Sequence, residues 1–229
     1  TNNEGANSSS VAEHIIMFMI ILYRNFIEQY SDLKKGKWNN LKELNLELEG
    51  KTLGIIGMGH IGIKLATRAN ALGMKVIYYD TLKKNKIVEK KLKIRFVNKK
   101  KLISSSDFLS INVSERPENK NLINNKIFNL MKKNSILINT SRGSVLNEED
   151  LVKAIQKKKI AGAALDVFEK EPLNKKSPLF DLENVFLAPH ISGNFPEYQV
   201  DVINQFVQNL NKFLSGKNLI NRVCKKRLY

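Results

Sequence analysis

Short apolar runs recur along the chain from residue 53 onward, with segments of helical periodicity between them. The runs are rich in isoleucine, valine and leucine and cover residues 53–58, 75–79, 108–113, 135–139, 160–167 and 185–188. They do not alternate with polar residues, as is typical of parallel strands that are covered on both faces. The pattern predicts an α/β fold, a Rossmann-type doubly wound parallel sheet with flanking helices.

Helices are predicted between these strands and at both ends of the chain. One has its apolar positions at Ile61, Leu65, Ala69 and Leu72. Residues 147–158 carry acidic residues in the first turn and lysines at the end, which suits the helix dipole. A last helix is expected to begin at Pro196 and to stop at Gly216. We expect residues 1–194 to form the main domain and residues 195–229 a separate C-terminal segment.

The first helix is unusually apolar. Ser10 and Glu13 have the spacing of a capping box, and the helix is expected to reach about Tyr30. Residues 15–23 are apolar on nearly every side, so other elements or a second subunit should cover them. The apolar run 15–22 is shorter than the roughly 20 residues that cross a bilayer. We therefore expect no membrane anchor.

Composition adds a strong positive charge to this picture. Lysine and arginine number 38 against 22 aspartates and glutamates, a net charge of +16. Nucleic-acid binding is one interpretation, and a biased codon composition, favoured by the many asparagines and isoleucines, is the other. A single cysteine, Cys224, allows no intrachain disulfide and indicates a reducing, cytoplasmic compartment. Three dispersed histidines and this cysteine give no metal-ligand spacing, so no metal site is expected.

A glycine-rich loop follows the first predicted strand and opens a helix. Its sequence is Gly57-Met58-Gly59-His60-Ile61-Gly62. In this context Gly57 allows the turn, Gly59 lets a pyrophosphate approach the backbone, and Gly62 lets the helix pack closely. Asp80 ends the next strand, where a carboxylate would bind the ribose hydroxyls. The loop predicts a dinucleotide site and favours NAD over NADP, although nearby lysines could soften that preference.

Three further motifs follow in order. They are Asn139-Thr140-Ser141-Arg142-Gly143, then Ala164-Leu165-Asp166-Val167-Phe168-Glu169-Lys170-Glu171-Pro172, then Pro189-His190-Ile191-Ser192-Gly193. With the glycine loop they resemble the D-isomer-specific 2-hydroxyacid dehydrogenases, over essentially the whole chain. The resemblance implies an NAD-dependent oxidoreductase that reduces small 2-oxoacids to D-2-hydroxyacids.

The resemblance also implies a catalytic set of Arg142, Glu171 and His190. A guanidinium binds a carboxylate through two hydrogen bonds, so Arg142 would anchor the substrate. Imidazole changes its charge near neutral pH, so His190 would donate the proton to the carbonyl oxygen. Glu171 would pair with His190 and stabilise the imidazolium.

The remaining site residues are expected to contact the cofactor. They are His60, Ile61, Thr140, Ser141, Asp166, Ser192 and Gly193, with Arg142 and His190 contributing as well. By resemblance Asp166 contacts the nicotinamide or its carboxamide rather than moving a proton. Glu169 has no assigned task, and His14 is interpreted as structural.

The chain also departs from the family pattern. Members normally carry a substrate domain of about a hundred residues before the first helix, and this stretch is absent here, so residues 195–229 are interpreted as the segment that returns to that domain. Residues 112–116 replace a usual histidine and Pro-Leu-Thr run beside the adenosine.

Two functions therefore stand beside each other. The first is a reductase that acts on glyoxylate, hydroxypyruvate or a similar 2-oxoacid, and the second is an NADH-sensing, corepressor-like binding protein on the same fold. In both cases we expect a homodimer that pairs through its nucleotide-binding domain. Nucleic-acid binding is the weakest of the three interpretations.

Overall fold

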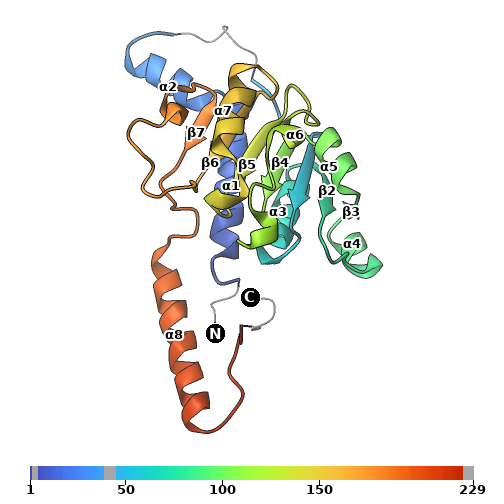
Figure 1. Ribbon diagram of the computed structural model, residues 1–229, viewed down its shortest axis with the longest axis vertical. Coiled ribbons are helices and arrows are strands. Elements are labelled where there is room, and N and C mark those ends of the chain that lie inside the picture. Colours follow the sequence, from blue (N-terminus) through green and yellow to red (C-terminus); the bar gives the residue numbers. More distant parts are fainter. Residues whose placement is uncertain (2–4, 39–44, 224–229) are drawn as a thin grey trace.

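The computed structural model describes residues 1, 5–38 and 45–223 (Figure 1). The strands are β1 (Thr52–Ile56), β2 (Lys75–Tyr79), β3 (Ile94–Phe96), β4 (Phe108–Ile111), β5 (Ile136–Asn139), β6 (Gly162–Leu165) and β7 (Val185–Leu187). The helices are α1 (Ser8–Tyr23), α2 (Phe26–Lys34), α3 (His60–Ala71), α4 (Lys86–Lys91), α5 (Lys99–Ser105), α6 (Asn125–Phe128), α7 (Glu148–Gln156) and α8 (Pro196–Leu214). Single 3-10 turns lie at Pro117–Asn119, Gly143–Val145 and Pro178–Asp181.

The strands form one sheet in the order β3-β2-β1-β4-β5-β6-β7, and every pair is parallel. The chain leaves β1 to build one half of the sheet through β2 and β3, then crosses back to β4 and builds the other half. This topology confirms the doubly wound fold that the apolar runs predict. Ligands of such sheets bind where the order reverses, beyond the carboxyl ends of β1 and β4.

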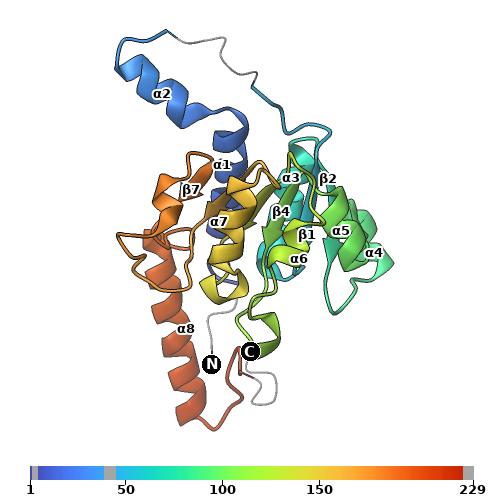
Figure 2. The ribbon, with the colours of Figure 1, turned by 45° about the horizontal axis from the view of Figure 1, so that its top comes forward.

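Helices cover both faces of the sheet (Figure 2). On one face α1 and α3 pack together over β1, with Ile15, Leu65 and Phe108 in their core. On the other face α5, α6 and α7 bury a second core, which includes Leu102, Phe128 and Leu151. The central strands β4 and β5 are buried at every position, which explains why their sequences are almost wholly apolar.

Two sequence predictions about α1 were wrong. Ser10 does not cap the helix, because the helix begins at Ser8, and its hydroxyl instead donates to the carbonyl oxygen of Ser192 at 2.7 Å. The helix also stops at Tyr23 rather than reaching Tyr30, because Asn25 adopts a left-handed conformation with φ +45°. The chain then begins α2 in a new direction, 63° from α1.

One strand was missed by the sequence analysis. β3 has only three residues at the edge of the sheet, and Arg95 at its centre is exposed. It therefore lacks the continuous apolar run that marks the covered strands. No single helix in the described ranges is long and apolar enough to cross a membrane; only the bent pair α1 and α2 meets that test jointly.

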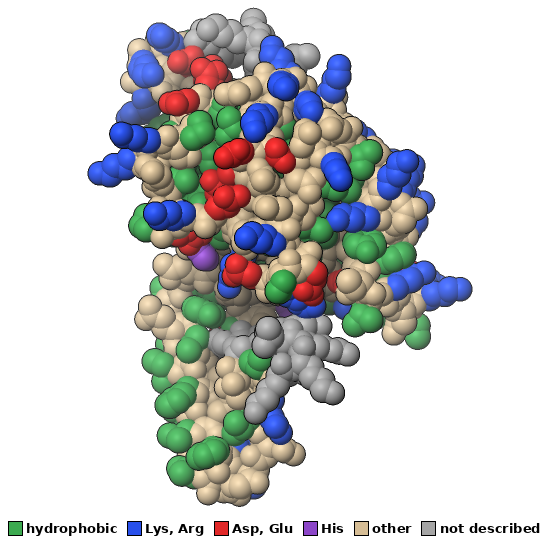
Figure 3. Space-filling model, viewed as in Figure 1, with side chains coloured by type: hydrophobic (Ala, Val, Ile, Leu, Met, Phe, Trp, Pro, Cys, Tyr) green, Lys and Arg blue, Asp and Glu red, His purple; other side chains and the backbone are tan. Residues whose placement is uncertain are grey.

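Helix α8 extends away from the sheet (Figure 1). It starts at Pro196 and ends before Gly216, as predicted. Figure 3 shows hydrophobic side chains along the visible face of this helix. Its exposed apolar residues are Val200, Val202, Ile203, Phe206, Val207, Leu210, Phe213 and Leu214. Only Asn209 is buried, because its amide bonds both backbone groups of Ile220 in the segment that turns back. The division of the chain at residue 195 stays a prediction.

Candidate active site

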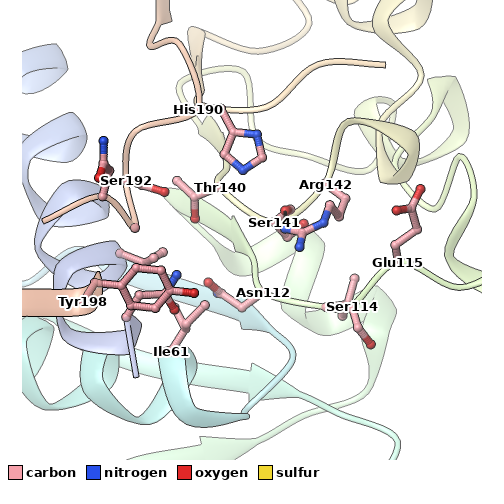
Figure 4. Close-up of a pocket in the computed structure, with 15 residues that line it drawn as sticks. Ile61, Asn112, Ser114, Glu115, Thr140, Ser141, Arg142, His190, Ser192 and Tyr198 are labelled. Carbon is pink, nitrogen blue, oxygen red and sulfur yellow. Dashed lines mark hydrogen bonds between the residues drawn. The ribbon is translucent and has the colours of Figure 1, made fainter. Parts of the chain in front are cut away.

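A cavity of about 790 Å³ lies at the carboxyl end of the sheet, where the strand order reverses (Figure 4). It is lined by Asn7, Val11, Ile61, Asn112, Val113, Ser114, Glu115, Thr140, Ser141, Arg142, His190, Ser192, Gly193, Asn194 and Tyr198. These residues come from α1, from the loops after β4, β5 and β7, and from the first turns of α3 and α8. The cavity therefore occupies the position at which open parallel sheets bind their ligands.

The glycine loop has the shape that a pyrophosphate needs. Gly57 has φ +92°, and a side chain there would collide with the carbonyl group of Asn112. A side chain at Gly62 would meet the carbonyl oxygen of Gly57, whereas the Cβ position of Gly59 has no atom within 4 Å. Two glycines thus close the turn and the third leaves an open approach to the N-terminus of α3.

Asp80 closes the same loop from β2. Its Oδ2 accepts a 2.7 Å hydrogen bond from the amide of Met58, and its Oδ1 accepts from the amide of Leu82 at 3.1 Å. The carboxylate is therefore fixed beside the glycine loop. This is the location that the sequence predicts for a group binding a ribose, and the contact itself stays a prediction.

Two polar atoms on the cavity wall are buried without a hydrogen-bond partner in the described residues. They are Oγ1 of Thr140 and Oδ1 of Asn112. Buried polar atoms are normally paired with protein or with water, so an unpaired atom on a cavity wall is available to a water molecule or to a polar ligand. Together with the open space at Gly59, these atoms fit a dinucleotide.

Arg142 is held by the end of β5. Asn139, fully buried, donates from Nδ2 to the carbonyl oxygen of Arg142 at 3.0 Å and accepts from the Ser141 amide at 3.1 Å. The guanidinium is exposed toward the cavity and donates to the carbonyl oxygen of Ser141 at 2.7 Å. A fixed backbone thus presents a cation to the cavity.

His190 and Glu171 lie in direct contact, as the sequence predicts. Nδ1 of His190 lies 2.7 Å from Oε2 of Glu171, and the ring faces the cavity (Figure 4). The second oxygen of Glu171 accepts from the amide of Phe168 at 3.0 Å. Partial burial raises the pKa of the Glu171 carboxyl. Hydrogen bonds from His190 and Phe168 and the positive charges of His190 and Arg142 lower it by more, so the pKa lies below its usual value.

The loop after His190 is held by Asp166. This carboxylate is fully buried and accepts from the amides of Ile191 at 2.8 Å and Ser192 at 2.9 Å. His190 itself has φ +55°, an uncommon conformation for a residue with a side chain. Asp166 contacts this loop and does not line the cavity. Its contact with a nicotinamide stays a prediction.

The structure brings together part of the predicted set. Ile61, Thr140, Ser141, Arg142, His190, Ser192 and Gly193 line the cavity, and Gly57, Gly59, His60, Gly62, Asp80, Asp166 and Glu171 are not among its lining residues. Glu171 lines a second cavity, which shares His190 with the first. The sequence analysis placed residues 112–116 beside the adenosine but did not count Asn112, which lines the cavity, among the site residues. It also missed Asn7, which reaches the loop at Gly193 from the other end of the chain. In the described part of the chain, no three metal-binding side chains gather at one point.

Comparison with known proteins identifies the family. Residues 16–192 match the model of the D-isomer-specific 2-hydroxyacid dehydrogenase NAD-binding domain. The chain belongs to this family. The match extends to the fold. The D-mandelate dehydrogenase of Rhodotorula graminis superposes on 96% of the chain with a TM-score of 0.90, and the two are 28% identical in sequence. The chain covers 67% of that protein. The chain therefore has the domain that binds a nicotinamide dinucleotide in these dehydrogenases.

Individual relatives in the family are similar over nearly all of the chain. The glyoxylate reductase of Korarchaeum cryptofilum is 36% identical over 97% of the chain, which spans 69% of that reductase. The D-3-phosphoglycerate dehydrogenase of Archaeoglobus fulgidus is 37% identical over 96% of the chain, which spans 42% of that enzyme. The relatives thus contain more polypeptide than the chain does.

Proposed function

We propose that the protein is an NAD-dependent reductase of small 2-oxoacids, which forms D-2-hydroxyacids. The observation that carries the proposal is the 2.7 Å contact between His190 and Glu171, because the His190 ring lines the same cavity as Arg142. A cofactor held by the glycine loop and Asp80 supplies the hydride when it is bound. The side chains of the chain itself then bind the substrate and move the proton.

Each catalytic side chain has a distinct task in this proposal. Arg142 binds the substrate carboxylate and sets the orientation of the adjacent carbonyl group. His190 donates a proton from Nε2 to the carbonyl oxygen, since Nδ1 is directed at Glu171. Glu171 keeps the ring in that orientation and stabilises its charged form. In the oxidation direction His190 takes the proton back.

NAD rather than NADP is the proposed cofactor. Asp80 lies fixed at the end of β2, and its carboxylate would repel a phosphate on the ribose. Thr140 and Asn112 offer their unpaired oxygens to the polar groups of the same cofactor. NADPH should therefore be oxidised much less efficiently than NADH.

The exposed apolar surfaces favour two further contacts. We propose that α8 packs on a substrate domain elsewhere in the protein, because its apolar side chains are uncovered here and the relatives are longer than the chain.

We propose a homodimer through α1 and α2, which expose Met17, Ile20, Phe26, Ile27, Tyr30 and Leu33. Sedimentation that finds a stable monomer of the full-length protein would contradict the dimer. A cytoplasmic location is inferred only from the single cysteine, Cys224, which lies outside the described residues.

The test is NADH oxidation by the full-length protein with a panel of 2-oxoacids. Turnover should be lost in His190→Ala and Arg142→Ala, and it should fall when NADPH replaces NADH. Substrate affinity should weaken mainly in the arginine variant, because its guanidinium binds the ground-state carboxylate as well. A protein that binds NADH but turns over none of the panel would contradict the reductase and favour the NADH-sensing function.

A further inference from the structure

Two glutamates outside the cavity bind each other's backbone. The amide of Glu148, the first residue of α7, donates to Oε1 of Glu169 at 3.3 Å. In return the amide of Glu169 donates to Oε1 of Glu148 at 2.6 Å. The two residues are 21 positions apart, so this reciprocal pair joins two separate segments of the site.

Both segments carry a proposed catalytic group. Glu148 follows the turn that presents Arg142, and Glu169 lies two residues before Glu171. The segments also touch directly, because a side chain at Gly143 would collide with the backbone of Phe168. Phe168 in turn donates its amide to Glu171 at 3.0 Å. A continuous series of contacts therefore runs from α7 to the carboxylate that binds His190.

We propose that Glu148 and Glu169 are positioning residues for the proton-transfer pair. Their reciprocal bonds hold the segment of Glu171 against the turn of Arg142. The ring of His190 is thereby fixed relative to the substrate anchor. This inference rests on the proposed function, since it assigns the pair a part in the same reaction.

Glu148 serves this contact through its oxygen as a hydrogen-bond acceptor, and its negative charge is not needed. Burial raises the pKa of the Glu148 carboxyl, the bond from the Glu169 amide lowers it, and the charge of Glu169 raises it again, so that it stands above its usual value. The amide of a glutamine provides an acceptor oxygen at the same position without the repulsion between two carboxylates. Glu148→Gln should therefore preserve the contact that Glu148→Ala removes.

Kinetics of the full-length protein test the proposal. We expect Glu148→Ala and Glu169→Ala to lower kcat for 2-oxoacid reduction roughly tenfold while KM for NADH stays within about twofold, because small displacements of a catalytic group lower the rate strongly. Glu148→Gln should stay near the wild-type kcat. Glu149→Ala is the matched control, since Glu149 is the next residue of α7 and pairs with Lys153 of the same helix at 3.6 Å.

A spectroscopic measurement separates positioning from stability. The protein has three histidines, so the ring ¹⁵N signals of His190 can be assigned by comparison with His190→Ala. At a pH where the ring is neutral, we expect one ring form in the wild type and in Glu148→Gln, with the proton on Nδ1, and a mixture of the Nδ1–H and Nε2–H forms in Glu148→Ala. The proton that Nε2 donates in the reaction is the second proton of the charged ring. Equal losses of kcat in the alanine and glutamine variants, or an unchanged His190 ring in Glu148→Ala, would overturn the proposal. If the wild-type protein has no turnover, the reductase function fails and the ring spectrum alone decides this inference.

Discussion

The hydroxyl of Ser10 donates a 2.7 Å hydrogen bond to the carbonyl oxygen of Ser192. The two residues are 182 positions apart, and the bond ties helix α1 to the loop that follows His190. The same loop is also held by Asp166, the residue that follows β6. The position of the histidine therefore depends on helix α1, near the N-terminal end of the chain, as well as on Asp166.

Loss of the Ser10 bond should destabilise the protein. We expect Ser10→Ala to lower the free energy of unfolding by about 1 kcal/mol relative to Ser9→Ala, because a typical hydrogen bond contributes that amount. Ser9 is the control, since it lies in the same turn of α1 and gains the same helix propensity when it is replaced by alanine. Urea unfolding measures the difference. Equal stability of the two variants would contradict the prediction.

Local patterns were sufficient to predict most of the sheet. Strand β2 has the predicted bounds, and α8 begins and ends where Pro196 and Gly216 indicate, because apolar runs and helix-terminating residues act within a few positions. β3 was missed because an edge strand of three residues with an exposed Arg95 is not apolar enough to stand out. The covered strands carry the strong signal.

Contacts between distant segments could not be predicted in the same way. The spacing of Ser10 and Glu13 satisfies a capping rule, yet Ser10 bonds Ser192 and Glu13 pairs with Arg68 at 2.6 Å. Asn7 reaches Gly193 only because the fold brings the start of α1 to the loop after β7. The pairing of His190 with Glu171 was expected from a family resemblance, which already contains the three-dimensional arrangement. Without that resemblance, the spacing of 19 residues indicates no contact.

Asp166→Asn should weaken the loop that carries His190. An asparagine offers one acceptor oxygen where the carboxylate bonds two amides, so one of the amides of Ile191 and Ser192 faces an NH₂ group instead. We expect a loss of roughly 2–3 kcal/mol in unfolding free energy, since the site is fully buried. Unfolding at neutral pH measures the loss, and a variant as stable as the wild type would contradict it.

The same variant should change the titration of His14. Burial lowers the pKa of His14 below its usual value of 6.5, and the negative charge of Asp166 raises it in opposition. Removal of that charge should therefore lower the pKa of His14 further. NMR titration of the imidazole protons gives the result, and an increase in the pKa would refute this account of the charge.

Two glycines of the dinucleotide loop should respond differently to alanine. Gly59→Ala places a methyl group in open space, so we expect unfolding free energy to change by less than about 0.5 kcal/mol and NADH affinity to fall at least tenfold. Gly62→Ala places it against the carbonyl oxygen of Gly57, so stability should fall by about 1–3 kcal/mol. Fluorescence titration with NADH and thermal unfolding separate the two effects. Loss of stability in Gly59→Ala would show that the space is not open.

Protonation of Glu171 should remove a part of the stability of the fold at low pH. In the folded protein the pKa of this carboxyl lies below its usual value of 4.5, so the folded state binds fewer protons than the unfolded state near that pH. The contribution of the Glu171 carboxylate to the free energy of unfolding is then fully present above pH 4.5. It is lost as the pH falls through the lowered pKa of the folded state. We expect wild type to be more stable than Glu171→Gln at neutral pH, and the difference to shrink progressively below pH 4.5. Because the carboxylate is partly exposed, the difference should be modest and should decrease with added salt. Chemical unfolding of both proteins across this range measures it, and a difference that grows on acidification would reverse the sign of the assigned interaction.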